Sequence, residues 1–463
     1  MRTAVLMLLV VLAAPPAAAQ PPARDRQPQQ GSRSCQVQVD SVLGNANFNR
    51  LTDGTQQVFA GGGVFARCLN EPTTMQSDSM AYFERLGELR FIGRVQFRDS
   101  ASALDADRVT YWIRQERLYA EGNVYTRNLR TGSDLRGPNL DYYRAVPPLR
   151  DTLEIRASGR PLIHFYPPRD SGRDPGRAFR IRADRVRMRH TDRMWGGGRV
   201  EIDRADLTAR SDSASLNLAD SVATLTGGSP YVIGRDTTLP SDSNTYRLDA
   251  LRIRFDLDGN QDVRRILAMD SAVAVGPDWR LTADTLDLTL DSSRVQRAQA
   301  WGTVRRPVAT SGLNTVTGDS LDIQMPRQVM SQILSFGGAR AITRDSARVE
   351  EDWLAGQDSL HARFAATDSA GRRRSEVERV VAFGSARAYY HTENRRDAAG
   401  PRGINYVRGS RIAIAMRSRR VRTVDVVGQV DGLYLEPLPT PPADTTRTDT
   451  TRADTSRVRP RPR

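Results

Sequence analysis

The sequence predicts an all-β protein, an elongated array of about eleven stacked β-hairpins. Three observations support this fold class. Apolar residues alternate with polar ones in segment after segment, which is typical of strands with one buried face. The same pattern recurs along most of the 463 residues. A glycine recurs in the second strand of nearly every unit, where it indicates a sharp bend or a close approach of backbones.

The segment 103–128 shows the repeated unit most clearly. Its first half alternates around Asp107 and Arg108, where one extra residue is inserted, and such an insertion is typical of a β-bulge or corner. Its second half alternates without a break. The polar run 114–117 between the halves predicts a hairpin turn. We therefore expect each unit to be two strands with one apolar face each.

The register of this unit recurs along the chain. Apolar or small residues stand three and one positions before a central residue, and two and four positions after it. The central residues are Asp40, Asp78, Asp107, Pro138, Asp184, Asp212, Asp249, Asp284, Asp319, Asp358 and Ser410. The glycines of the second halves are Gly62, Gly93, Gly122, Gly159, Gly198, Gly227, Gly302, Gly338, Gly384 and Gly428, with Ser271 in the unit of Asp249. We interpret these glycines as the fold line of each strand.

The two ends of the chain differ in composition from the array. Residues 1–19 have the form of a secretory signal peptide, with Arg2, an apolar run and a small-residue site at Ala17 to Ala19. A membrane anchor is the alternative, but the apolar run is shorter than the ~20 residues that span a bilayer. We expect a disordered linker over 20–34 and the β-repeat array over 35–436.

Polar insertions interrupt the array. The insertion at 166–178 is rich in proline, glycine and charge, and it is a candidate boundary between two segments. Residues 437–463 are rich in proline, threonine and arginine and contain almost no apolar residues. Because such a segment cannot bury a core, we expect a disordered tail.

The chain has two cysteines, Cys35 and Cys68. They lie close to the N-terminus that signal cleavage would leave, and a disulfide is chemically permitted in an exported protein. Neither belongs to a Cys-x-x-Cys pair or follows an apolar lipobox. We therefore expect a disulfide between them with a stabilising role and no redox function.

The chain is basic, with a formal net charge of +14, and all 68 of its basic residues are arginine. A codon bias could produce this composition. Arginine nevertheless pairs well with phosphate and carboxylate, so the excess suits anionic partners. Nucleic acid is disfavoured because the chain has no clustered basic helix and no known nucleic-acid motif. An anionic glycolipid fits better.

The segments SDSMAYFERLGELRFIGRVQFRD (77–99) and DADRVTYWIRQERLYAEGNVYTRN (105–128) resemble OstA repeats, the modules of the LptA family of lipopolysaccharide-transport proteins. The match is most specific in the Ala-Asp-Arg-Val-Thr-Tyr and Glu-Gly-Asn-Val stretches, and it is clear over residues 36–128. The resemblance implies a twisted, V-shaped β-jellyroll that carries lipopolysaccharide acyl chains in its groove as part of a periplasmic bridge. This chain is longer than a typical member of that family.

The function expected from this resemblance is that of a periplasmic lipid-binding conduit. Its cargo would be lipopolysaccharide or a related anionic glycolipid, moved between the inner and outer membranes, and association with the outer membrane is left open. Unpaired edge strands would bind other jellyroll transport proteins or a second copy. The residues expected to line the groove are Met80, Tyr82, Phe91, Val95, Val109, Tyr111, Leu118, Val124, Leu286, Leu288, Leu321 and Ile323.

Two other classes of function compete with the conduit. The first is a structural or adhesive β-repeat protein with a closed, dry core. Inward residues of mixed size would leave space for lipid, and Ala106, Ala120, Gly122, Ala283 and Ala300 favour that space. The second is a carbohydrate-active β-helix enzyme, which is disfavoured because no inward carboxylate pair stands on neighbouring units.

No catalytic residue, cofactor or metal ligand is expected. The histidines are scattered, and none forms a metal-ligand spacing: His164, His190, His361 and His391. The repeated aspartates lie ~30 or more residues apart, too far for the short period of calcium-binding β-roll repeats. An aspartate followed by serine or threonine is better explained by hydrogen bonds to free backbone donors at a bulge.

Overall fold

The computed structural model describes residues 35–69, 71–166, 178–190, 192–236, 245–259, 261–345, 350–369, 372–392, 402–417 and 420–436. The expected signal peptide, linker and tail lie outside these residues, as does most of the insertion at 166–178. The described chain is all-β, as predicted, and contains 32 strands with short 3-10 turns such as η2 (Ile113–Gln115). None of the helical segments in the described ranges is long and apolar enough to span a membrane.

The chain forms two compact units. Among the described residues, unit 1 comprises those of 35–130, 134–159 and 187–190, and unit 2 comprises those of 131–133, 160–186 and 192–436. The strands of unit 1 are β1 (Val37–Val42), β2 (Ala46–Arg50), β3 (Gln56–Cys68), β4 (Thr74–Phe83), β5 (Glu88–Arg98), β6 (Ser102–Trp112), β7 (Arg117–Asn128), β8 (Asp134–Tyr143) and β9 (Glu154–Ser158). Strand β12 (Arg185–Arg189) contributes residues to both units.

Unit 2 contains the remaining strands. They are β10 (Leu162–Phe165), β11 (Phe179–Arg182), β13 (Arg193–Arg204), β14 (Leu207–Asn217), β15 (Val222–Thr226), β16 (Tyr231–Arg235), β17 (Thr245–Asp249), β18 (Arg252–Leu257), β19 (Val263–Val275), β20 (Trp279–Asp291), β21 (Arg294–Trp301), β22 (Val308–Ser311), β23 (Asn314–Thr317), β24 (Ser320–Gln324), β25 (Gln332–Phe336), β26 (Ala339–Asp345), β27 (Glu350–Gly356), β28 (Ser359–Ser369), β29 (Arg372–Thr392), β30 (Gly403–Arg417), β31 (Arg420–Val427) and β32 (Asp431–Leu435). A 3-10 turn, η5 (Pro326–Gln328), lies between β24 and β25.

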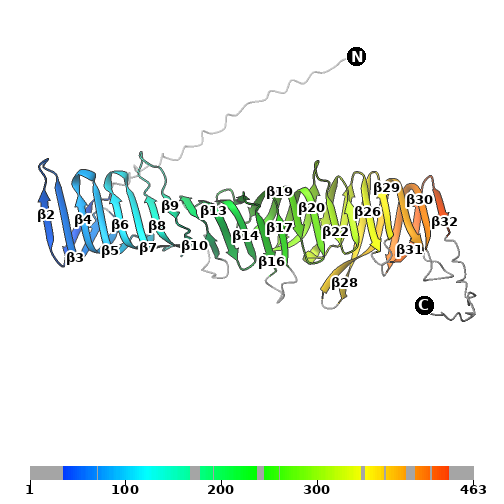
Figure 1. The fold of residues 1–463 in the computed structure, drawn as a ribbon, viewed down its shortest axis with the longest axis horizontal. Coiled ribbons are helices and arrows are strands. Elements are labelled where there is room, and N and C mark those ends of the chain that lie inside the picture. Colours follow the sequence, from blue (N-terminus) through cyan, green and yellow to red (C-terminus); the bar gives the residue numbers. More distant parts are fainter. Residues whose placement is uncertain are drawn as a thin grey trace, which may run out of the picture. The chain divides into compact units, whose positions relative to one another are not determined.

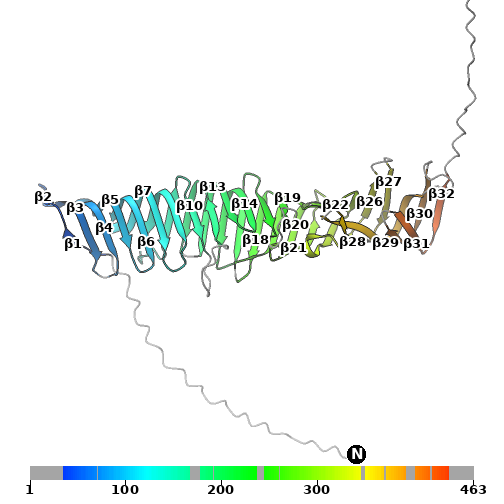
Figure 2. The ribbon, with the colours of Figure 1, turned by 90° about the horizontal axis from the view of Figure 1, so that it is seen from below.

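In unit 1 the strands from β3 to β8 pair antiparallel with their neighbours in chain order (Figures 1 and 2). The register shifts near the middle of each pairing, so each long strand bends and its two halves belong to different ladders. We call them ladder A and ladder B. Ladder A begins with β2 and the first half of β3, and ladder B begins with β1 and the second half of β3.

Unit 2 has the same two ladders, although several of its bent strands are replaced by two short ones. Strand β14 shows how this happens. Its second half pairs with β15 and its first half with β16. Further along, β20 pairs in the same way with β21 and β22. Insertions at the fold line therefore leave the ladders intact.

The bends have a common construction, in which the central residue of one unit lies against a glycine of the next strand. Gly122 has φ +76°, and a Cβ atom there would lie 2.4 Å from Oδ2 of Asp107. Asn123, which follows Gly122, donates a hydrogen bond to the same carboxylate. At the preceding bend Arg94 donates to Asp78, and this hydrogen bond lowers the pKa of Asp78.

Some bends differ in detail from the sequence pattern. Asp319 lies against Gly337, whereas the neighbouring Gly338 lies against Arg306. Gly62 lies against the backbone of Gly44 in the turn between β1 and β2, and Asp40 instead pairs with Arg67. The reason is that the first unit splits into two short strands, so a turn replaces the aspartate at that bend.

Candidate functional site

Unit 1 contains a cavity of about 800 Å³ between its two ladders, beside the first strands. This volume lies within the ~300–1,000 Å³ that is usual for ligand sites. The side chains that form its walls are mainly apolar and come from both ladders. The lining residues are Cys35, Gln36, Val37, Val39, Val42, Ala46, Phe48, Val58, Ala60, Met80, Tyr82, Leu89 and Ile113.

The alternation of the first strands creates this cavity. In β3, Val58 and Ala60 face the interior, and Val58 lies opposite Tyr82 while Ala60 lies opposite Met80 on β4. Strand β2 is an edge strand, which pairs only with β3 among the described residues. Its Phe48 lines the cavity and is nevertheless 73% exposed. The cavity is therefore accessible at this edge.

Of the twelve residues predicted to line a groove, Met80 and Tyr82 line this cavity. Six others lie in unit 1, where they are buried: Phe91, Val95, Val109, Tyr111, Leu118 and Val124. In ladder A, Met80, Phe91 and Val109 lie opposite one another on successive strands. Val95 and Val124 belong to ladder B. These side chains thus share the interior of unit 1 beyond the cavity.

The other four predicted residues lie in unit 2. Leu286, Leu288, Leu321 and Ile323 are between 0% and 2% exposed and belong to a continuous apolar cluster that extends from Leu207 to Ile414. Leu286 and Leu321 flank Ala300 across three neighbouring strands. The opposed apolar side chains fill this part of the interior, so it has the packing of a closed core.

Unit 2 also has a smaller apolar cavity, of about 90 Å³. It lies near the first strands of the unit and is lined by residues that include Phe165, Phe179, Met194, Leu225 and Phe255. None of the predicted groove residues lines it. Its volume is far below that of a usual ligand site, and we assign the candidate site to unit 1.

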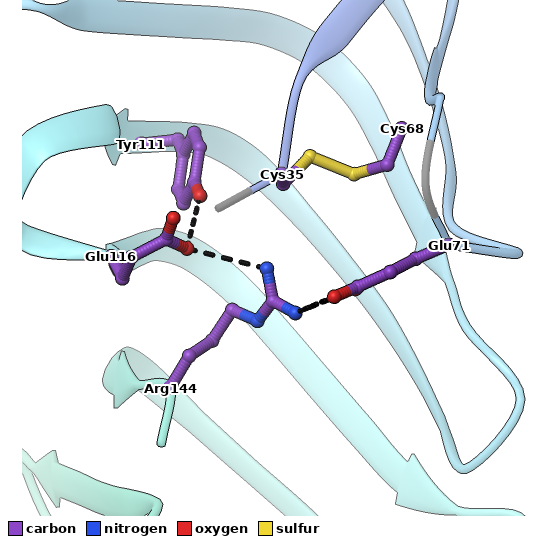
Figure 3. Close-up of a disulfide and its surroundings, with 6 residues drawn as sticks. All are labelled: Cys35, Cys68, Glu71, Tyr111, Glu116 and Arg144. Carbon is purple, nitrogen blue, oxygen red and sulfur yellow. Dashed lines mark hydrogen bonds and ion pairs between the residues drawn. A yellow bond between two sulfur atoms is a disulfide. The ribbon is translucent and has the colours of Figure 1, made fainter. Parts of the chain in front are cut away.

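A disulfide and a polar network flank the cavity of unit 1 (Figure 3). Cys35 and Cys68 form a disulfide with a Cα–Cα distance of 5.3 Å, and Cys35 itself lines the cavity. Close to it, the Tyr111 hydroxyl donates a 2.6 Å hydrogen bond to Glu116, and Arg144 lies between Glu116 and Glu71.

The charges of this network stabilise each other. Burial opposes the charge of Arg144, but its hydrogen bond to Glu71 and the charges of both glutamates outweigh that effect and raise the pKa of Arg144. Burial and the hydrogen bond to Glu116 likewise raise the pKa of Tyr111. Both shifts keep Arg144 charged and the Tyr111 phenol neutral at neutral pH. In the described ranges no three His, Cys, Asp or Glu residues are arranged to hold a metal ion.

Sequence reasoning missed most of the cavity wall. The first hairpin carries the register of Asp40, yet none of its residues was predicted to line the groove. Four of them line the cavity: Val37, Val39, Val42 and Phe48. The signal was present, because Val37, Val39 and Val42 occupy three of the four template positions. The contribution of Cys35 and Ile113 could not be read from the pattern, since both stand outside strands.

No protein-family model and no curated protein sequence matches this chain. Among solved structures, the chain is similar to LptH from Pseudomonas aeruginosa, described as the LptA homologous periplasmic component of the lipopolysaccharide transport device. The identity is 13%, the alignment covers 29% of this chain and 96% of LptH, and the TM-score is 0.24. A likeness this low carries no conclusion about function.

Proposed function

We propose that the protein binds lipid acyl chains between the two ladders of unit 1 and acts as a periplasmic lipid-binding protein. The observation that carries this proposal is the apolar cavity of about 800 Å³ at the exposed first edge. An alkyl chain that enters such a space is removed from water, and this transfer of apolar surface favours binding. The net charge of +14 favours an amphiphile with an anionic head group.

The finer proposal is that the cargo is lipopolysaccharide or a related anionic glycolipid, carried between the inner and outer membranes. The resemblance of residues 77–128 to OstA repeats supports this choice. Exposed edge strands support docking to another jellyroll protein or to a second copy, because an unpaired edge is a template for strand pairing. Strand β32, with Leu433, Tyr434 and Leu435 about half exposed, is such an edge in unit 2.

The filled core of unit 2 favours a second candidate function, a structural scaffold with a closed interior. The cluster from Leu207 to Ile414 supports this reading for unit 2, since several of its leucines are completely buried. The two candidate functions apply to different parts of the chain, lipid binding to unit 1 and a structural role to unit 2. One protein can therefore have both.

Binding of alkyl phosphates should depend strongly on chain length. Each methylene group buried in the cavity contributes ~0.8 kcal/mol, which is about a fourfold gain in affinity. Octyl, decyl and dodecyl phosphate should therefore bind in order of increasing affinity, as measured by isothermal titration calorimetry below their micelle concentrations. A negative heat-capacity change should accompany binding.

A pair of substitutions in β3 tests where the chain binds. Ala60→Leu adds three carbon atoms inside the cavity and should weaken the binding of the longest probe most. Gln57→Leu, on the same strand and outside the cavity lining, is the matched control and should leave the affinity unchanged. Affinities that do not change with chain length, or that respond equally to both variants, would contradict binding in this cavity.

A further inference from the structure

The two ladders of unit 1 are joined along the fold line, and the strand-connecting turns lie at their outer ends, on the side away from the fold line. We call this side the mouth. Glu71 lies in the turn between β3 and β4, at the outer end of ladder B. Glu116 lies in the turn between β6 and β7, and Arg144 directly follows β8, both at the outer end of ladder A.

Arg144 joins these two ends across the mouth. It donates from Nη2 to Glu71 at 2.5 Å and from Nη1 to Glu116 at 3.2 Å, as Figure 3 shows. Glu71 and Arg144 are 73 residues apart in the sequence. The contact therefore depends on the closure of the two ladders and not on local structure. It is the one ion pair across the mouth that the described residues of unit 1 show.

The network is held unequally on its two sides. On ladder A, Glu116 is 2% exposed and is fixed by Tyr111 and Arg144. On ladder B, the Glu71 side chain is 27% exposed and its partner in the network is Arg144 alone. Glu71 is thus the member that leaves most easily. The disulfide of Cys68, three residues before Glu71, anchors the turn that carries it.

The network also has an incomplete hydrogen-bond set. Oε1 of Glu116 is buried, and no described residue donates a hydrogen bond to it. A buried carboxylate oxygen without a donor is costly, so the network favours one further donor. A hydroxyl group or a protonated phosphate of a head group can supply that donor.

The network borders the cavity. Cys35 and Ile113 line the cavity, and both stand beside the network, Cys35 through the disulfide and Ile113 at the start of the turn that ends in Glu116. An alkyl chain in the cavity would place its head group at the mouth, because the apolar walls exclude it from the interior. Arg144 is the cation of the network that such a head group would meet.

We propose that Glu71, Arg144 and Glu116 form a clasp across the mouth of unit 1, and that the anionic head group of a bound amphiphile opens it by replacing Glu71 on Arg144. This inference rests on the proposed function and adds to it the residue that recognises the head group. Arg144 suits this exchange, because a guanidinium binds carboxylate and phosphate with the same planar set of donors.

Unit 2 provides a comparison within the same chain, since its ladders are joined across their outer ends by several contacts. Arg204 donates to Asp262 at 3.3 Å, Trp279 donates to the carbonyl oxygen of Gln328 at 3.2 Å, and the backbone N–H of Ser375 donates to Asp278 at 3.0 Å. The filled core of unit 2 lies behind these contacts. A single exchangeable clasp in front of an open cavity therefore distinguishes unit 1.

The test is calorimetric titration of the full chain with dodecyl phosphate, with dodecanol as the neutral probe and inorganic phosphate as the head group alone. Glu71→Gln frees Arg144 from its competitor while Glu116 still pairs with it, so the affinity for dodecyl phosphate should rise about fivefold. Arg144→Gln should lower that affinity about tenfold and leave dodecanol binding unchanged. Glu121→Gln, which breaks the exposed Arg108–Glu121 pair of the same unit, is the control and should change neither.

The outcomes separate the clasp from the proposed function. If dodecyl phosphate binds the wild type, Glu71→Gln and Arg144→Gln with equal affinity, the clasp is wrong and acyl-chain binding stands. If no form binds either alkyl probe, both are wrong. If inorganic phosphate alone competes at concentrations close to those of dodecyl phosphate, Arg144 is a site for free phosphate and the clasp does not recognise lipid. Melting curves of Glu71→Gln, which leaves the buried Glu116–Arg144 pair in place, verify that the comparison is made on folded protein.

Discussion

Leu288→Asp should unfold unit 2. Leu288 is 0% exposed and lies between Ile266 and Ala298 on the neighbouring strands. The substitution removes an apolar side chain from a packed core, which costs ~2–5 kcal/mol, and it places an unpaired carboxylate there. The sum is comparable with the ~5–15 kcal/mol by which a typical domain is stable. Urea denaturation followed by circular dichroism should show loss of most of the cooperative transition.

Met80→Asp is the matched variant in the cavity of unit 1. Met80 borders an open space of about 800 Å³, so water can solvate the new carboxylate there. We expect a loss of about 1–2 kcal/mol, in the ordinary range for a single substitution. Equal losses in the free energy of unfolding for Leu288→Asp and Met80→Asp would contradict an open interior in unit 1 and a filled one in unit 2.

Gly122→Val should strongly destabilise the fold line of unit 1. Gly122 has φ +76°, which costs a residue with a side chain ~1–2 kcal/mol, and its Cβ atom would lie 2.4 Å from Oδ2 of Asp107. Overpacking adds ~1–3 kcal/mol. We expect the free energy of unfolding to fall by about 2–5 kcal/mol, measured by urea denaturation.

Gly54→Val controls for backbone strain, because Gly54 has φ +83° and nothing lies within 4 Å of its Cβ position. It should lose about 1–2 kcal/mol from the left-handed conformation alone. Asp107→Ala in the Gly122→Val background should recover only the part of the loss that the carboxylate causes, because the Asp107 Cβ atom, 2.8 Å from the new Cβ position, remains in alanine. Similar losses for Gly122→Val and Gly54→Val would mean that the close approach of strands at the bend contributes little.

The strands and their bends could be predicted from the sequence, because alternation and the inserted residue are local signals. The bulge expected at Asp107 and Arg108 is present as a register shift between β6 and β7. At one bend the sequence pattern predicts Gly338, whereas Gly337 is the glycine that lies against Asp319. Either glycine permits the left-handed conformation, and only the position of Asp319 on the neighbouring strand selects one of them.

The filling of the interior could not be predicted in the same way. Small inward residues such as Ala300 were interpreted as space for a ligand, yet Ala300 is 1% exposed and lies between Leu286 and Leu321. An alanine beside large neighbours admits a side chain from the opposite sheet as readily as it leaves a void. Which of the two occurs depends on the facing ladder, and strand-by-strand alternation carries no information about it.

Contacts across the mouth could not be predicted from the sequence at all. Arg144 stands after β8 and Glu71 after β3, and neither belongs to the repeated register. Both look like ordinary charged residues in turns. Their contact follows only when the bends bring the two ladders face to face, so the network beside the cavity becomes visible in three dimensions alone.

The most direct test of the account is photo-crosslinking of the full chain with photo-methionine, which replaces every methionine by an analogue of nearly the same shape. Met80 lines the cavity of unit 1, whereas Met325 and Met330 are buried in the core of unit 2. After irradiation in the cells that produce the protein, mass spectrometry should find lipid adducts at Met80 and none at Met325 or Met330. Lipid adducts at the core methionines, or none at Met80, would contradict an acyl-chain site at the first edge of unit 1.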